Sequence, residues 1–356
     1  MNILERYLGL HFLRSYLLVL LVLLALFGFL DLVSELSEVG EGNYRIGDAL
    51  LYVLSTFPTR LLDFSAICTL MGGSLALAAL VRSSELLAMR TAGMALHQVM
   101  LALTKVVLAL VLLLALNAEF VAPRIQQWGY IHRQQALAGS DTLRTFQGFW
   151  SRDRRQFLNI RAIAHGQLLQ GVSIYQFDPD GRLLTFIYAE EAQVVREGDW
   201  LLKNVNYKRW HGGILTSEQM ARLRWPSFLT PRQLATLEMP PDTLSITSLW
   251  SYVNYLKATN QKSEQYELIF WQRVLLPVSM AVMLLFLLPV AVSSPRAGGF
   301  GWQVVFAIVV GVLYFLATQV IANLGLLLDL SPLLTALLPT VAVLLLSLVL
   351  ARRVVY

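Results

Sequence analysis

Residues 17–30 read LLVLLVLLALFGFL, a run that contains no charged side chain. The run lies within an apolar segment at about 8–33, with Arg14 near its start. A helix that crosses a bilayer needs about 20 mostly apolar residues, so this segment is long enough to span. No small-residue cleavage site follows the run, which argues against a cleaved signal peptide. We therefore interpret the segment as a retained first membrane helix.

Five further apolar segments meet the same length requirement. We expect them at about 57–81, entered through Pro58, and at 99–122, stopped by Pro123, then at 269–292, 302–327 and 333–350. Composition agrees, because 56% of residues are hydrophobic and 14% are charged, against about 25% charged in soluble domains. The sequence therefore predicts an α-helical membrane protein with six transmembrane helices, split three and three.

The charges of the short loops predict an orientation. With the N-terminus in the cytoplasm, the inner loops hold eight basic and two acidic residues, and the short outer loops hold one basic and six acidic residues. Both termini are then cytoplasmic. Because the positive charge is concentrated beside the membrane, the net charge of +5 does not indicate a nucleic-acid partner.

The region 124–267 differs in composition and pattern. Apolar and polar residues alternate with period two at 157–160, 172–177 and 182–188, as in half-buried strands. The turn residues of 178–181 (DPDG) and 197–199 (EGD) predict hairpins, and 248–260 has helical spacing. We expect a β-rich sandwich or roll with a short return helix. The predicted domains are 1–123, 124–267 and 268–356.

Familiar catalytic motifs are absent from the sequence. No lysine lies in a G-x-x-x-x-G-K-[ST] loop, the histidines do not form H-E-x-x-H, and there is no G-x-S-x-G. The single cysteine, Cys68, excludes a disulfide within the chain. We expect no catalytic residue, no metal and no cofactor in this chain. If the protein works against a gradient, another subunit supplies the energy.

The cytoplasmic segment 82–94 reads RSSELLAMRTAGM. As a helix it places Leu86, Met89 and Arg90 on one face, with Ser83 or Ser84 as a cap and Gly93 as a stop. Such a helix either docks another protein or lies on lipid headgroups, and the pattern alone favours neither interpretation.

Residues 82–94 resemble the coupling helix of the LptF/LptG family, the permeases that export lipopolysaccharide. Similar words occur along the chain: LERYL at 4–8, FVAP at 120–123, LSIT at 244–247, YVNYLK at 252–257, WQR at 271–273 and PVSMAVM at 277–283. The order of three helices, an extracytoplasmic domain and three helices also resembles the family. Several of these short sequences are more similar to the LptG branch of the family.

The resemblance implies an inner-membrane permease that extracts lipopolysaccharide and passes it to a periplasmic bridge toward the outer membrane. It implies an LptF paralogue beside this chain, an LptB dimer that supplies ATP and Mg²⁺ chemistry, and LptC and LptA as acceptors. The periplasmic domain would be a β-jellyroll-like module. The alternatives are a permease of another lipid or lipoprotein ABC system and a membrane scaffold without transport.

The resemblance also implies three groups of site residues. The ATPase-coupling group is Arg82, Ser84, Glu85, Leu86, Met89, Arg90 and Gly93, although Glu85 is alternatively a solvated capping residue. The lipid-phosphate candidates are Arg60, Arg124 and Arg133, because arginine binds phosphate through two hydrogen bonds. The lateral-gate candidates are Leu26, Phe27, Leu30, Phe306, Val310, Leu313 and Ala317, for which ordinary packing is the alternative.

One region departs from the family pattern. Other members carry lysines at the outer end of the first helix, where this chain has Asp31, Ser37 and Glu38. Phosphate binding would then fall to Arg60, Arg133 or the partner, or to divalent cations held by the acidic side chains. Arg60 is alternatively paired with Asp63, three residues later. Gly72, Gly73 and Gly311 are expected at close helix contacts.

Overall fold

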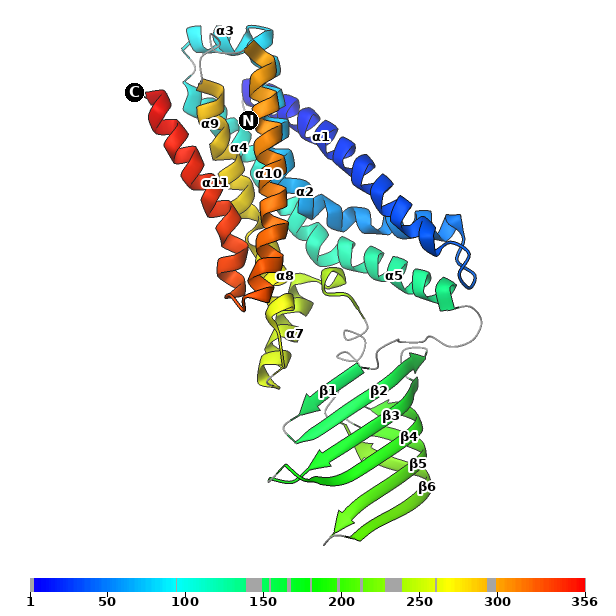
Figure 1. The fold of residues 1–356 in the computed structure, drawn as a ribbon. Coiled ribbons are helices and arrows are strands. Elements are labelled where there is room, and N and C mark those ends of the chain that lie inside the picture. The colour runs from blue at the N-terminus through cyan, green and yellow to red at the C-terminus, as the bar shows by residue number, and fades with distance from the viewer. Residues whose placement is uncertain are drawn as a thin grey trace.

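A computed structural model of the chain describes residues 3–93, 95–138, 149–153, 155–164, 168–179, 181–196, 199–211, 214–227, 239–259, 261–292 and 299–355. Helices gather at one end of the molecule and a β-sheet lies at the other (Figure 1). The helices are α1 (Ile3–Glu35), α2 (Ile46–Arg82), α3 (Glu85–Thr91), α4 (Leu96–Leu116), α5 (Ala122–Ala138), α7 (Ile246–Ala258), α8 (Glu264–Val274), α9 (Leu276–Val292), α10 (Gly299–Leu327) and α11 (Pro332–Val355).

Among these described residues, five helices are long and apolar enough to cross a membrane, and the bent pair α8–α9 makes six if it is one span. The two members of that pair meet at Leu275 at an angle of 49°. The sequence predicts one membrane helix at about 269–292, and the structure has this bent pair there. Pro277 accounts for the break, because it cannot donate the helical hydrogen bond to the carbonyl of Arg273, four residues earlier, and its ring crowds that carbonyl.

The second helix begins earlier than the sequence predicts, at Ile46, so that Pro58 lies inside it. Proline removes one hydrogen bond of the helix and crowds the carbonyl four residues earlier. Polar side chains bond neighbouring carbonyls of this turn: Ser55 and Thr56 donate to the carbonyls of Tyr52 and Val53, and Asn117 donates to that of Pro58. The helix continues through the proline.

The third helix does not end at Pro123 as predicted. A π-helical turn, η2 (Asn117–Val121), follows α4, and α5 then continues to Ala138. The residue four positions before Pro123 is Glu119, which lies within the wide π turn. That turn accommodates the proline ring where a regular α-helix would clash with it.

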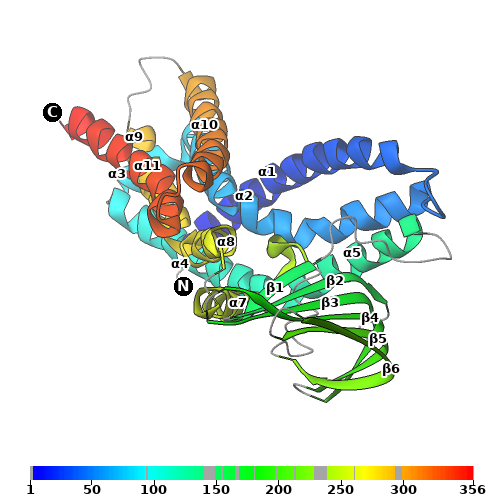
Figure 2. The same cartoon turned by 60° about the horizontal axis from the view of Figure 1, so that its bottom comes forward.

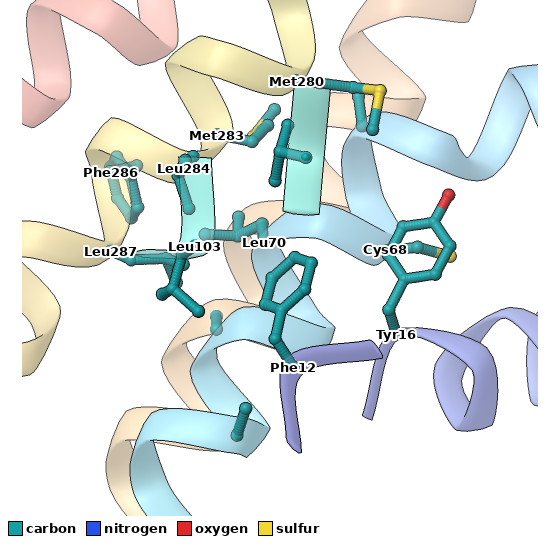
Figure 3. Packing of buried hydrophobic residues seen from close by; sticks show 14 of the residues in the cluster. Phe12, Tyr16, Cys68, Leu70, Leu103, Met280, Met283, Leu284, Phe286 and Leu287 are labelled. Carbon is teal, nitrogen blue, oxygen red and sulfur yellow. The ribbon is translucent and has the colours of Figure 1, made fainter. Parts of the chain in front are cut away.

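Buried side chains of α1, α2, α4 and α9 form the core of the helical part (Figure 3). The predicted close contacts are confirmed at all three glycines. A Cβ on Gly72 would lie 2.7 Å from the Tyr16 Cα, one on Gly73 would lie 2.3 Å from Leu287, and one on Gly311 would lie 3.1 Å from Ile67. Cys68 is fully buried in this core.

The sheet is a six-stranded antiparallel meander in the order β1 to β6. Its strands are β1 (Phe149–Asp153), β2 (Gln156–Ala164), β3 (Leu168–Phe177), β4 (Leu183–Arg196), β5 (Asp199–His211) and β6 (Ile214–Pro226). Figure 2 shows that the sheet is strongly curved. One face carries a separate apolar core that includes Leu158, Ile174 and the fully buried Trp200.

The predicted antiparallel β-domain is confirmed, but its strands form one curved sheet within the described residues rather than a two-layer sandwich. Both predicted hairpins are present. Gly181 donates to the Asp178 carbonyl between β3 and β4, and Arg196 pairs with Asp199 between β4 and β5. Asp180, Glu197 and Gly198 lie outside the described residues. The predicted return helix is α7, capped by the Ser245 hydroxyl.

Candidate functional site

The short helix α3 lies at the end of the bundle farthest from the sheet (Figure 1). It ends as predicted, with Gly93 at φ +96° and its N–H donated to the Arg90 carbonyl. The predicted serine cap is wrong. Ser84 has φ +61° and makes no capping hydrogen bond, and Ser83 Oγ lies against the carbonyls of Ala79 and Leu80.

The two faces of α3 differ in exposure. Leu86 is 6% exposed within the helical core, and Met89 packs against the same core. These two residues therefore anchor α3 to the bundle and do not point outward, contrary to the surface that the sequence predicts. The exposed side carries Arg82, Ser84, Leu87 and Arg90, and Leu87 is 64% exposed. Helical periodicity identifies the apolar face but does not say which way it points.

Glu85 begins α3 and is half-buried. The Tyr7 hydroxyl of α1 donates to Glu85 Oε2 at 2.6 Å. This hydrogen bond, followed by one from Ser83, lowers the pKa of the Glu85 carboxyl below its usual range. The Tyr7 hydrogen bond therefore favours the ionised form of Glu85. The sequence offers a solvated capping residue as the alternative, and such a residue would have no partner on another helix.

Arg60 lies in the outer half of α2 and faces α1. Its guanidinium donates to both carboxylate oxygens of Asp31, at 3.0 and 2.9 Å. The alternative pairing with Asp63 is wrong, because Arg60 pairs with the carboxylate 29 residues earlier on the neighbouring helix. This ion pair accounts for one acidic residue at the outer end of α1, because Asp31 neutralises the charge of Arg60 on the neighbouring α2.

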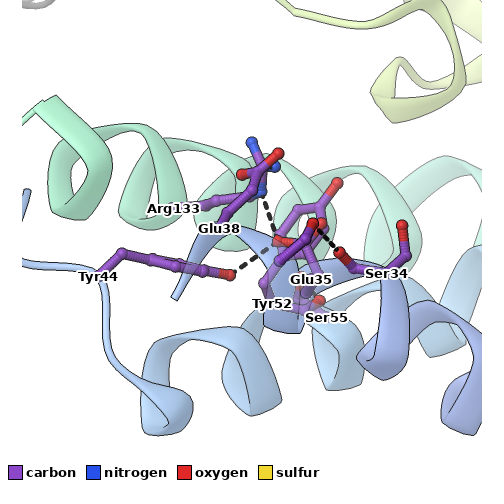
Figure 4. Close-up of polar contacts among 8 residues, drawn as sticks. Ser34, Glu35, Glu38, Tyr44, Tyr52, Ser55 and Arg133 are labelled. Carbon is purple, nitrogen blue, oxygen red and sulfur yellow. Dashed lines mark hydrogen bonds and ion pairs between the residues drawn. The ribbon is translucent and has the colours of Figure 1, made fainter. Parts of the chain in front are cut away.

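Arg133 of α5 is held by the same acidic end of the first helix (Figure 4). Its Nε donates to Glu35 at 2.8 Å, and a second nitrogen donates to Glu38 in the 3-10 turn η1 (Leu36–Glu38). Tyr44 donates to Glu35 at 2.9 Å, and only 15% of the Arg133 side chain is exposed. We call Asp31, Glu35, Glu38, Arg60 and Arg133 the outer ionic cluster.

Arg124, the third phosphate candidate, is exposed on α5 and forms no ion pair with the residues that the structure describes. It lies outside the outer ionic cluster. The same described residues contain no group of three His, Cys, Asp or Glu side chains arranged to hold a metal ion.

A cavity of about 580 Å³ lies beside the outer ionic cluster, between the outer halves of α1, α2, α8 and α10. Asp31 and Arg60 line it, together with Asp63, which the sequence offered only as a partner of Arg60, and with Asp242 and Arg273, which sequence analysis did not propose for any site. Asp63 and Arg273 interrupt apolar segments, and a charge in such a segment is the signal that would have identified them.

Arg273 of α8 joins the helices to the segment that leads from the sheet. It donates to the backbone carbonyls of Asp242 and Leu244, in and after the 3-10 turn η3 (Pro241–Thr243). Gln127 of α5 donates to the Thr243 carbonyl at 3.0 Å, and Glu119 accepts from Thr247. Side chains from three helical elements therefore fix this segment.

The gate candidates are not gathered in one place. α1 and α10 both pack on α2, and the two helices meet through the aromatic pair Phe27 and Phe315, whose centroids are 5.5 Å apart. Leu26, Leu30 and Leu313 are more than half exposed, whereas Val310 is buried and Phe306 stacks on Phe286. Ala317 is half-buried. Among the candidates, Phe27 alone bridges α1 and α10.

The chain is similar to known proteins along nearly its whole length. Residues 6–353 match the family described as "Lipopolysaccharide export system permease LptF/LptG". Over 354 residues the chain is 33% identical to lipopolysaccharide export system permease protein LptG of Escherichia coli strain K12, covering 99% of this chain and 98% of that protein. It is 28% identical over 341 residues to LptG of Haemophilus influenzae, covering 95% of each chain.

Proposed function

Because this chain belongs to the LptF/LptG family of lipopolysaccharide export permeases, we propose that its two ends perform separate steps of export. Helix α3 receives movement from an ATPase, and the outer ionic cluster meets the phosphates of the lipid. The observation that carries this proposal is the separation of the two sites: α3 lies at the end of the bundle farthest from the sheet (Figure 1), and the outer ionic cluster lies around the C-terminal end of α1. Export permease function itself follows from the family.

The topology and partners belong to the same proposal. Both termini and α3 lie on the cytoplasmic side of the inner membrane and the sheet lies in the periplasm, as the loop charges support. An LptF paralogue completes the permease, an LptB dimer hydrolyses ATP, and LptC and LptA receive the lipid. This chain then holds no nucleotide or cofactor of its own. The membrane parts are 1–123 and 268–356, and α5 extends the first of them beyond the bilayer.

Extraction of the lipid requires an apolar surface inside the permease. Burial of each acyl CH₂ is worth about 0.8 kcal/mol, so exposing one chain of about twelve carbons to water costs on the order of 10 kcal/mol. Exposed leucines of α1 and α10, among them Leu26, Leu30 and Leu313, supply such a surface. ATP-driven movement of α3 would reshape this surface and release the lipid toward the sheet.

Phosphate recognition at the outer ionic cluster requires an exchange of partners. Arg133 is bound by two carboxylates of its own chain, which occupy the donors that a phosphate would use. A lipid phosphate carries more charge than one carboxylate and accepts through several oxygens, so it can replace Glu38, the more exposed of the two. Until the lipid arrives, the two carboxylates offset the cost of burying the Arg133 charge.

This exchange predicts opposite effects for two substitutions. Arg133→Gln is expected to weaken lipopolysaccharide binding about tenfold, the loss typical of a charge-assisted hydrogen bond. Glu38→Gln is expected to tighten binding about threefold, because it frees Arg133 without removing the Glu35 pair. Binding of labelled lipopolysaccharide to the purified complex in nanodiscs measures both.

Glu41→Gln is the matched control, since it removes the same charge from the same loop, where Glu41 is exposed. Unchanged binding is expected for it. If Glu38→Gln and Arg133→Gln weaken binding equally, the ion pair is structural and the exchange is refuted.

A further inference from the structure

A hydrogen bond joins the first membrane helix to the coupling helix at the cytoplasmic end. The Tyr7 hydroxyl lies 2.6 Å from Glu85 Oε2, although the two residues are 78 positions apart in the sequence. A hydroxyl bonded to an ionised carboxylate at this distance is among the stronger hydrogen bonds in proteins. It connects α1 to α3 directly.

The tyrosine ring is itself held in place. His11, one turn later on α1, packs against it with ring centroids 4.6 Å apart. The neighbouring Leu8 is 1% exposed and belongs to the helical core. Tyrosine has few rotatable bonds, so its hydroxyl cannot follow Glu85 far unless α1 moves as well. Movement of α3 therefore reaches the backbone of α1.

Helix α1 connects this hydrogen bond to the outer ionic cluster. It is one continuous helix from Ile3 to Glu35, about 50 Å long at 1.5 Å per residue. Its outer end carries Asp31 and Glu35, which hold Arg60 and Arg133. A hydrogen bond weakens steeply when the distance between donor and acceptor increases by about 1 Å. A small displacement of α1 therefore weakens the hydrogen bonds from its carboxylates to both arginines.

We propose that Tyr7 positions Glu85 and makes α1 move together with α3, so that ATPase movement at the coupling helix alters the carboxylate hold on Arg60 and Arg133. Tyr7 is a positioning residue, since it acts through Glu85. The proposal rests on the proposed function of α3 as the ATPase dock. It adds the route by which that movement reaches the lipid-binding end.

The test compares Tyr7→Phe with wild type in the assembled permease–ATPase complex in proteoliposomes. Tyr7→Phe removes one hydroxyl and leaves the ring that packs on His11. The amount of bound ATPase and the rate of ATP hydrolysis are expected to stay within about twofold of wild type. Lipopolysaccharide released per ATP is expected to fall about fivefold, because α3 moves without α1.

Lys105→Gln is the matched control. It removes another link at the same end of α1, the 2.6 Å ion pair between Lys105 and Glu5, which joins α1 to α4 rather than to α3. Release per ATP is expected to be unchanged. The double variant Tyr7→Phe with Glu85→Ala is expected to release no less per ATP than Glu85→Ala alone, because Glu85→Ala already removes the acceptor of the Tyr7 hydroxyl.

Two results would overturn the proposal. Normal release per ATP by Tyr7→Phe shows that α1 is not driven through this bond, and loss of ATPase binding by Tyr7→Phe shows that Tyr7 only supports the dock. Failure of the proposed function is distinguishable, because the ATPase would then bind equally well to Glu85→Arg and wild type.

Discussion

Replacing Glu85 with arginine is expected to reduce lipopolysaccharide release to background while the protein remains folded in the membrane. The substitution reverses the charge at the first residue of α3, where a helix favours a carboxylate. It also removes the acceptor of the Tyr7 hydroxyl and places a cation among Arg82 and Arg90. Release of labelled lipid from proteoliposomes, more than tenfold below wild type, is the measurement.

Glu85→Gln separates charge from hydrogen bonding in the same experiment. Its amide oxygen still accepts from Tyr7, so an intermediate loss is expected if both features matter. Thr91→Ala is the control on the same helix, because Thr91 is exposed and its hydroxyl contacts only the local Ala88 carbonyl. Wild-type release by Glu85→Arg in a complex that still contains its ATPase would remove Glu85 from the coupling step.

The second large effect is expected at Gly72 of α2, which lies directly against the backbone of α1. A Cβ there would lie 2.7 Å from Tyr16 Cα and 2.9 Å from Tyr16 N, so the backbone of α1 must move away. Forcing atoms into a packed core costs about 1–3 kcal/mol. Gly72→Ala is therefore expected to lower the thermal midpoint by a few degrees and to weaken export by displacing α1.

Gly47→Ala provides the opposite expectation in the same helix. No atom lies within 4 Å of the position that its Cβ would occupy, and alanine favours a helix over glycine by roughly 0.5–1 kcal/mol. The midpoint is therefore expected to stay or rise. Thermal unfolding in detergent, followed by light scattering, compares the two variants. If the thermal midpoint falls equally in both variants, the close contact with Tyr16 is not the cause of the lost stability.

Hydropathy predicts the apolar helices because the bilayer requires about 20 apolar residues whatever the tertiary packing. It misplaces their ends where proline occurs. The helix continues through Pro58, whose carbonyl accepts from Asn117, 59 residues away, and it passes Pro123 through a π turn, neither of which a local pattern contains. The strands and hairpins are found from alternation and turn residues, which are local. Whether strands form one layer or two depends on contacts distant in sequence.

The candidate sites follow the same division. The position of α3 and its end at Gly93 are local properties, and they were predicted. The partners of Arg60 and Arg133 lie 29 and 95 to 98 residues away, on α1 and in η1, so no pattern around either arginine reveals them. The inward direction of Leu86 is likewise set by the helices beneath α3 and not by its own sequence.

Cys68 is the single cysteine of the chain, and it is fully enclosed by the helical core. Its burial has a practical consequence for following the movement of α1. A maleimide probe or spin label reacts with accessible thiols, so the natural sequence provides a nearly silent background. A pair of cysteines introduced at exposed positions, one on α3 and one at the outer end of α1, would carry the only reporters. Their separation could then be recorded through the ATP cycle without first removing a native thiol.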